Sequence, residues 1–509
     1  MSPRAIVLLV AAFFLQTLAA QTSPKATAES VLNKLYLANG NKIYPKPSIE
    51  VISDERKAAQ YIRRTNTIEV GVKAFEVCRV FGKDSLSALA FIIGHEMAHA
   101  FQMNPRQGSF LAYDKENGAD IDAEKDADIQ GLFNTWLAGY NSMDLLLYII
   151  EGIYVAYDLK GKELPGYPSL EERKQSAREV RLIVTELVRM YETGCYLSVI
   201  GQYDLAAACF RYVESRYKGR EVYNNIGVNL VLQAINISEK NVDPYIFPLE
   251  LDFETRLKKP KADRGPGDLT PEQWLQRGTL LARAAEYFAQ ASKMDDECLP
   301  ADVNYVCALV LNAKAAEAIE YCERREVVKK SKLLGLSAAE QGKVKLALAL
   351  AYAYNHRTES FAMFDELKAS SDNFVGFTAN YNASVLAGKT PVTSSNTPCQ
   401  IISDTDNLVD EVKVHRPVTG AWAMLDNATQ IEVSTVPNKT SDLITFRVNG
   451  QNRISLQRIR RELATTGLSL NAVATSRGHL DVCREKQVIV LVDDKSRQVR
   501  EWVKYYEFK

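Results

Sequence analysis

The spacing of apolar residues changes along the chain and separates a helical part from a part made of strands. Residues 85–101 carry apolar side chains at helical spacing, as does an Ala- and Tyr-rich region from about residue 182 to 386. Beyond residue 399 the spacing shortens to that of strands, with one helical stretch. The strands are predicted at 431–436, 442–448, 487–492 and 499–508, with a turn at Asn449-Gly450, and the helix at 454–464. The pattern therefore predicts a mainly α-helical protein with a small C-terminal α+β domain.

Breaks in this pattern divide the chain, whose 509 residues suffice for about three domains. Prolines cluster at 236–271 and indicate a loop inserted into the helical region. The composition of 388–398, GKTPVTSSNTP, is typical of a linker. The predicted organisation is a signal segment at 1–20, a first domain at 21–181, the helical region at 182–387, the linker at 388–398 and the α+β domain at 399–509.

The N-terminal segment combines Arg4, an apolar run from residue 5 to 15 and the sequence Leu-Ala-Ala at 18–20, which ends in two small residues before Gln21. This arrangement is typical of a cleavable secretory signal, so we expect an exported protein, periplasmic or secreted. No other stretch approaches the ~20 uninterrupted apolar residues that cross a bilayer, and the best candidate, 145–157, contains Glu151. We therefore expect no integral membrane segment.

Charge and composition narrow the class of partner. Hydrophobic residues make up 46% and charged residues 25% of the chain, which is ordinary for a globular protein. The formal net charge is −1 and Lys and Arg form no clustered run, so the chain offers nucleic acid no attractive field. Nucleic-acid partners are not expected.

Eight cysteines in an exported chain are either disulfide bridges or small buried hydrophobic residues. Two pairs flank predicted helical turns symmetrically, and each would staple a helical hairpin or lie unpaired in its seam. A third pair lies in the C-terminal domain. The candidate pairs are Cys195 with Cys209, Cys307 with Cys322, and Cys399 with Cys483.

The motif HEMAH at residues 95–99 lies on the helix predicted at 85–101. His95 and His99 are four residues apart, so both imidazoles leave the same face of the helix and can bind one metal ion. Glu96 then lies beside the ion and can accept a proton from a bound water, as a zinc peptidase requires. Chance matches to this motif are common, and a core helix with two hydrogen-bonded histidines is the alternative.

A third ligand has to come from outside the motif. The chain has five histidines, and the other three lie far away in sequence, so we expect a carboxylate. Acidic residues are dense downstream: Asp114, Glu116, Asp120, Asp122, Glu124, Asp126 and Asp128. A solvated acidic helix face is one alternative, whereas a calcium-binding loop is set aside because Lys125 stands where that loop needs a glycine. Glu124 and Asp128 share a helical face, so one can bind the metal while the other orients a histidine ligand.

The same region resembles a known family. Residues 124–128, with Gly131 and the Ala-Gly-Tyr at 138–140, resemble the E-x-x-A-D…G…A-G-Y signature of the CAAX prenyl protease, HtpX and BepA type of zinc metallopeptidase, a gluzincin. Residues 66–72 resemble the edge strand along which that family pairs its substrate, and 167–173 resemble its H-P-x-x-x-x-R element. The resemblance is confined to the first predicted domain.

The resemblance implies a gluzincin metallopeptidase fold with one Zn2+ per chain, and it assigns the residues around the ion. Zinc binding falls to His95, His99 and Glu124, proton transfer to Glu96, support of the ligands to Asp128 and Arg173, and pairing with the substrate main chain to Thr67, Ile68, Glu69 and Val70. Tyr167 stands where the family usually has His. Its hydroxyl either donates a hydrogen bond to the oxyanion of the reaction or packs in its loop. The interval from His99 to Glu124 is short for the family.

The helical region resembles an array of tetratricopeptide repeats. Residues 201–210, GQYDLAAACF, resemble the join between the two helices of a repeat, and related stretches at 285–289 and 318–322 lie 33 residues apart. Stacked repeats present a surface that binds peptides or partner proteins. The alternative is a plain α-bundle without a binding role.

Together these resemblances imply an exported zinc endopeptidase that cleaves unfolded or misassembled polypeptides, which its repeats present or select. BepA-like proteins join the same two parts and act on outer-membrane proteins during assembly, so we expect cell-envelope quality control, with envelope protein complexes as partners. Two alternatives stay open. One is a non-catalytic or latent chaperone or scaffold that binds polypeptides through its repeats, and the other is a different zinc hydrolase on the same helix pair.

Overall fold

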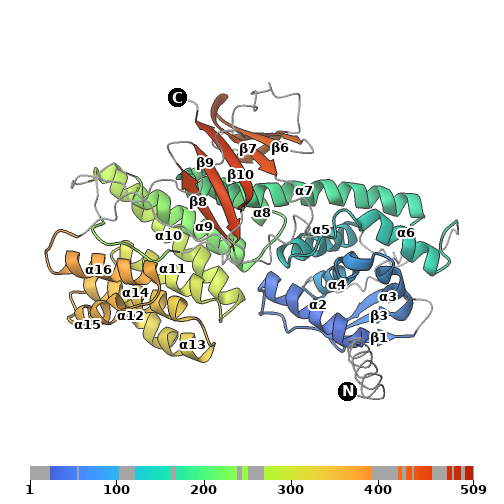
Figure 1. Cartoon of the computed structure of the whole chain (residues 1–509), viewed down its shortest axis with the longest axis horizontal. Coiled ribbons are helices and arrows are strands. Elements are labelled where there is room, and N and C mark those ends of the chain that lie inside the picture. The colour runs from blue at the N-terminus through green and yellow to red at the C-terminus, as the bar shows by residue number, and fades with distance from the viewer. Residues whose placement is uncertain are drawn as a thin grey trace, which may run out of the picture. The chain divides into compact units, whose positions relative to one another are not determined.

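The computed structural model (Figure 1) describes residues 23–53, 57–101, 121–161, 168–237, 243–249, 269–391, 422–426, 431–437, 441–460, 478–483, 487–493 and 499–507. The chain divides into two compact units, one of Met1–Asn39 and Tyr44–Thr185 and one of Gly40–Ile43 and Glu186–Lys509. The division falls inside helix α7 (Leu170–Ile200), near the predicted boundary at 181/182. The predicted signal segment and most of the predicted linker lie outside the described residues. Within them, no helix is both long and apolar enough to cross a membrane.

The first unit packs its helices around a small sheet and around the helix that carries HEMAH. Its elements are α2 (Pro24–Asn39), β1 (Ser48–Ile52), β2 (Ala59–Ile62), β3 (Thr67–Gly71), α3 (Val72–Arg79), the 3-10 helix η1 (Gly82–Asp84), α4 (Ser85–Phe101), α5 (Ile121–Leu137), α6 (Leu146–Ala156) and the first part of α7. Every residue of α4 from Ala88 to Ala98 is buried, because the helix is apolar on nearly all sides and lies among α2, α3, α5 and the sheet. Helix α4 is thus the core of this unit.

Helix α5 crosses α4 at close range because a glycine lies at the crossing. A Cβ atom on Gly131 would lie 2.7 Å from the amide nitrogen of His95 and 2.8 Å from the carbonyl carbon of Gly94. No side chain fits such a gap, so the close contact of the two backbones requires glycine. The crossing holds the first turns of α5 beside the histidine-bearing turns of α4.

Strand β3 lies at the centre of the three-stranded sheet and not at its edge. The strand order is β1-β3-β2, with β3 parallel to β1 and antiparallel to β2. Ile68, for example, pairs with Ile49 on one side and with Tyr61 on the other. The expectation that Thr67, Ile68, Glu69 and Val70 form an edge is therefore wrong. Alternating side chains identify a strand but carry no information on which of its sides is paired.

The second unit contains the helical region and a separate sheet. Its helices are the second part of α7, α8 (Tyr203–Glu214), α9 (Arg220–Ile235), α10 (Pro271–Met294), α11 (Leu299–Leu311), α12 (Ala315–Arg324), α13 (Val327–Leu333), α14 (Ala338–Tyr354), α15 (Glu359–Lys368) and α16 (Asn373–Leu386). Helices adjacent in sequence contact one another, as α14, α15 and α16 do in Figure 1. The protein is mainly helical, as predicted, and α9 ends and α10 begins at the borders of the predicted inserted loop.

Six cysteines of the described residues are buried and form no disulfide: Cys78, Cys195, Cys209, Cys298, Cys307 and Cys322. Neither Cys195 with Cys209 nor Cys307 with Cys322 forms the predicted bridge, so the structure shows the alternative without disulfides. Burial raises the pKa of the Cys78 thiol to about 12 and also raises the pKa of Cys209, Cys298, Cys307 and Cys322, so these thiols act as small hydrophobic side chains. The third candidate pair stays a prediction because Cys399 lies outside the described residues.

The C-terminal region forms a seven-stranded antiparallel sheet of order β4-β5-β6-β7-β10-β9-β8. Its strands are β4 (Trp422–Asp426), β5 (Ile431–Pro437), β6 (Ser441–Val448), β7 (Gln451–Arg460), β8 (Gly478–Cys483), β9 (Val488–Asp493) and β10 (Val499–Glu507). Asn449 and Gly450, with φ of 51° and 78°, form the predicted two-residue turn between β6 and β7.

The helix predicted at 454–464 is wrong for residues 454–460, which belong to β7 and pair with β6 and β10. Ile454 and Leu456 are buried, two positions apart, and this alternation is that of a strand. The part of this region that the structure describes contains strands and turns, so the α component of the predicted α+β domain is not seen there.

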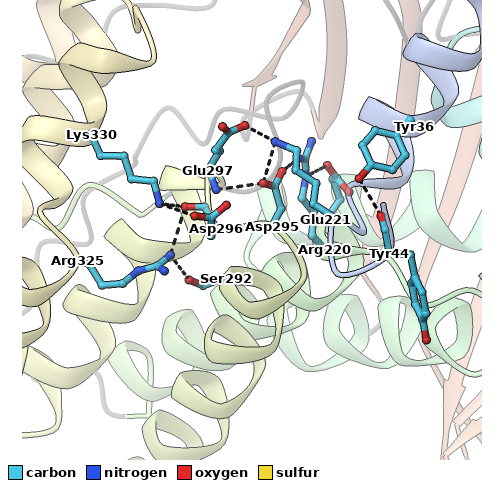
Figure 2. Close-up of polar contacts among 11 residues, drawn as sticks. Tyr36, Tyr44, Arg220, Glu221, Ser292, Asp295, Asp296, Glu297, Arg325 and Lys330 are labelled. Atoms are coloured by element: carbon cyan, nitrogen blue, oxygen red, sulfur yellow. Dashed lines mark hydrogen bonds and ion pairs between the residues drawn. The ribbon is translucent and has the colours of Figure 1, made fainter. Parts of the chain in front are cut away.

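A polar network joins helix ends within the second unit (Figure 2). Arg220, at the start of α9, forms ion pairs with Glu221 at 2.6 Å and with Asp295, the residue that follows α10. Lys42 also pairs with Asp295, at 2.9 Å. Its amide donates a hydrogen bond of 2.7 Å to the carbonyl of Met294. These contacts anchor the segment around Lys42 within the second unit.

Candidate metal centre

The two histidines of HEMAH point their ring nitrogens at one place. They lie one turn apart on α4, and their Nε2 atoms are 3.1 Å apart, with the rings nearly perpendicular at 81°. His95 is fully buried and His99 lies partly buried beside it. Since the burial of α4 fixes the backbone, both imidazoles are held in this orientation.

Glu124 of α5 faces both imidazoles. Its Oε2 lies 3.3 Å from Nε2 of His95, and its Oε1 lies 3.4 Å from Nε2 of His99. The ligand atoms of these three residues lie within 4.8 Å of one another, and no other His, Cys, Asp or Glu group in the described ranges meets this condition. Two nitrogen ligands of a tetrahedral zinc ion, each at about 2.0–2.1 Å, are about 3.3 Å apart. The spacing and the chemistry of the donors therefore fit one such ion.

The charges of the group call for a cation. Burial would raise the pKa of Glu124, but hydrogen bonds from His95 and His99 outweigh it and lower this pKa to about 2. Burial would likewise lower the pKa of His95, but hydrogen bonds to Asp128 and Glu124 raise it to about 10. Without a metal ion, Arg173 and a proton on His95 together offset the two buried carboxylates of Glu124 and Asp128. A bound cation supplies the same positive charge.

Asp128, one turn after Glu124, orients His95 through the ring nitrogen that does not face the other ligands. Its Oδ1 lies 2.8 Å from Nδ1 of His95, and a carboxylate can only accept, so Nδ1 donates and Nε2 faces the metal position. Arg173 of α7 donates to both oxygens of Asp128, with one bond of 2.9 Å. Burial would raise the pKa of Asp128, but the Arg173 guanidinium and His95 hold it well below its usual range. The buried pair thus fixes the acceptor that positions His95.

The remaining predicted site residues are placed as follows. Glu96 is fully buried on α4 and does not belong to the group of ligand atoms, which suits an acid that serves beside a metal ion. Tyr167 lies outside the described residues, so its role stays a prediction. The residues of β3 lie in the middle of the sheet.

Sequence reasoning treated Gly131 as a motif position and missed its physical role. Together with Gly94, it lets the backbones of α4 and α5 meet at the point that sets the distance between Glu124 and the histidines. A signal was present, because each of the two helices that carry ligands has a glycine in its interior. Interior glycines weaken helices, and their presence indicates close packing.

Comparison with known proteins assigns no family: no family model matches the chain, and no curated protein matches it. The class that the fold and the site define is therefore a mainly helical protein with a buried His-His-Glu group able to bind one metal ion.

Proposed function

We propose that the chain is an exported zinc-dependent endopeptidase of the gluzincin type. The observation that carries the proposal is the convergence of His95, His99 and Glu124 on one position, with Glu96 buried on the same helix as the two histidines. Structural zinc sites usually have four protein ligands, whereas catalytic sites have three and leave one position for water or substrate. Three ligands among the described residues, beside an additional buried acid, favour the catalytic kind.

Zinc bound here would lower the pKa of a coordinated water to about 7 and polarise the carbonyl of a peptide bond. Glu96 would accept the proton of that water and later donate it to the departing amine. Asp128 would keep His95 in the tautomer that presents Nε2, and Arg173 would keep Asp128 ionised and in place. Tyr167 is proposed, through the resemblance, as a donor to the oxyanion.

An extended substrate would pair with the sheet of the first unit. Since β3 is central, the edge strands of the described sheet are β1 and β2, and β2, which contacts α4, is proposed for this role. Main-chain pairing with an edge strand requires an extended substrate, so unfolded segments would be preferred to folded ones. Repeats of the tetratricopeptide type in the second unit would select such polypeptides, with envelope quality control as the setting.

The second candidate is a polypeptide-binding chaperone whose metal ion is structural or rarely active. Two observations favour it: the ligands are almost entirely shielded from solvent, with Glu124 7% exposed, and the helical unit holds a non-helical stretch of chain, as set out below. In that case the second unit would be the working surface.

The two candidates are separated by metal analysis and cleavage of an unfolded protein substrate, with wild type and Glu96→Gln compared. We expect one zinc ion in both, cleavage by wild type, and a rate about 10²–10⁴-fold lower in the variant, because a proton-transfer group is lost. Glu171→Gln, an exposed position at the start of α7, is the matched control and should cleave normally. Zinc in both proteins without cleavage by wild type would favour the chaperone.

A further inference from the structure

Between α9 and α10, residues 243–249 run without helix or strand across the helical unit. Their sequence is DPYIFPL, and Phe247 and Pro248 are buried. The stretch contacts side chains from three helices that are distant in sequence, α10, α14 and α16. Pro244 and Pro248 restrict its backbone and disfavour helix, and the chain bends at Tyr245.

Asn382 of α16 binds the main chain of this stretch. Its Oδ1 accepts a hydrogen bond of 2.8 Å from the amide of Ile246, and its Nδ2 donates one of 2.9 Å to the carbonyl of the same residue. A neighbouring β-strand offers a main chain the same pair of contacts. Asn382 is fully buried, so its amide is directed at this peptide unit and not at solvent. The recognition does not depend on the side chain at position 246.

Two further side chains contact the stretch. Arg277 of α10 donates two parallel hydrogen bonds, of 3.0 and 2.8 Å, to the carboxylate of Asp243. Tyr354 of α14 lies between two aromatic rings, with ring centroids 5.3 Å from Tyr245 and 6.0 Å from Phe247. Each of the three helices thus contacts a different feature of the stretch: α10 its negative charge, α16 a main-chain unit and α14 its aromatic rings.

One buried group at this place is left unsatisfied. The hydroxyl of Tyr354 is buried and has no hydrogen-bond partner among the described residues. A buried tyrosine hydroxyl ordinarily donates to an acceptor. A ligand with an acceptor beside Tyr354 would pair this hydroxyl, which the described residues leave without one.

We propose that Arg277, Tyr354 and Asn382 form a binding site for non-helical polypeptide segments, called here the peptide site, and that residues 243–249 occupy it as an internal pseudo-ligand. An external ligand would carry an acidic residue and an aromatic residue four positions later, with a non-helical main chain between them. It binds by displacing the internal stretch, whose tether gives it an effective concentration in the millimolar range. Peptide binding at this site requires no catalysis, so the proposal does not depend on the proposed peptidase activity.

The test uses the full chain in a Glu96→Gln background, so that the probe is not cleaved, and a fluorescein-labelled peptide of sequence DPYIFPL. Asp243→Ala combined with Phe247→Ala should release the internal stretch and tighten peptide binding at least tenfold. Adding Asn382→Ala should remove that binding, whereas adding Asn380→Ala, an exposed asparagine on the same helix, should leave it unchanged. A peptide with Ala in place of its Asp should bind at least tenfold more weakly.

A second measurement needs no variant in the stretch, in case the double substitution unfolds the chain. Hydrogen exchange at the amide of Ile246 should become faster when excess peptide displaces the stretch. Peptide binding that is absent from a folded double variant, or exchange at Ile246 that does not respond to millimolar peptide, would show that 243–249 is an ordinary part of the fold and overturn the proposal.

Discussion

The metal centre and the peptide site recognise their ligands in opposite ways. At the metal centre, the ligands His95 and His99 are close in sequence, one helix crossing brings Glu124 to them, and buried Asp128 orients His95. The peptide site uses residues from α10, α14 and α16, each of which contacts a different feature of the stretch 243–249. The first is rigid and suited to an ion, and the second tolerates variation and suits a chain. Short sequence spacing can therefore reveal the first but not the second.

The largest effect is expected for Glu124→Ala. The variant leaves two histidines without the carboxylate that completes the site, so zinc retained after dialysis should fall to background. Metal analysis of the dialysed protein measures this, with Glu171→Ala as the control that keeps its zinc. If Glu124→Ala retained as much zinc as wild type, the third ligand would be a residue other than Glu124.

Asp128→Ala should weaken zinc binding by roughly 10–100-fold, because His95 loses the acceptor that orients it. The change also leaves Arg173 buried without its carboxylate, which by itself destabilises the fold. Asp128→Ala combined with Arg173→Leu separates the two effects. The double variant should recover stability but not zinc affinity. Recovery of both would show that Asp128 only neutralises Arg173 and does not orient His95.

Gly131→Ala tests whether the helix crossing sets the metal centre. The added methyl group meets the backbone of α4, so we expect a loss of about 1–3 kcal/mol in the free energy of unfolding, together with weaker zinc binding. Gly278→Ala in α10 is the matched control, because its Cβ would meet only the side chain of Asn312 at 3.8 Å. That change should be neutral or stabilise by up to about 1 kcal/mol.

The zinc affinity of the first unit should rise about tenfold for each pH unit between pH 6 and 8. In the metal-free protein, hydrogen bonds to Asp128 and Glu124 raise the pKa of His95 to about 10, so this ring is protonated throughout that window. Zinc has to displace the proton, and raising the pH favours the displacement. Glu124, whose pKa is lowered to about 2, is already ionised and adds nothing to the slope. A flat affinity profile would contradict this charge balance.

The smallest effect is expected at the peptide site, for Tyr354→Phe. Removing a buried hydroxyl without a partner should be neutral or stabilise the fold by up to about 1 kcal/mol. Tyr321→Phe provides the contrast, because its hydroxyl donates a hydrogen bond of 2.6 Å to Asp302 and its loss should destabilise by about 1.5–3 kcal/mol. Urea unfolding measures both.

Sequence reasoning succeeded where the physics is local. The spacing of His95 and His99 on one helix and of Glu124 and Asp128 on another fixes which side chains share a face, so the group could be proposed before its geometry was seen. It failed for β3 because a strand's own residues do not reveal its neighbours, and for residues 454–460 because a short apolar stretch fits two periods. No sequence pattern indicated the role of Asn382, because its partner Ile246 lies 136 positions away.

Zinc titration of the metal-free protein, with cleavage of an unfolded substrate measured at each step, tests the central claim most directly. The account predicts that cleavage rises with added zinc and reaches its plateau at one ion per chain, and that Glu96→Gln takes up the same single ion without cleaving. A wild-type chain that saturates with one zinc ion and shows no cleavage at any step would contradict it.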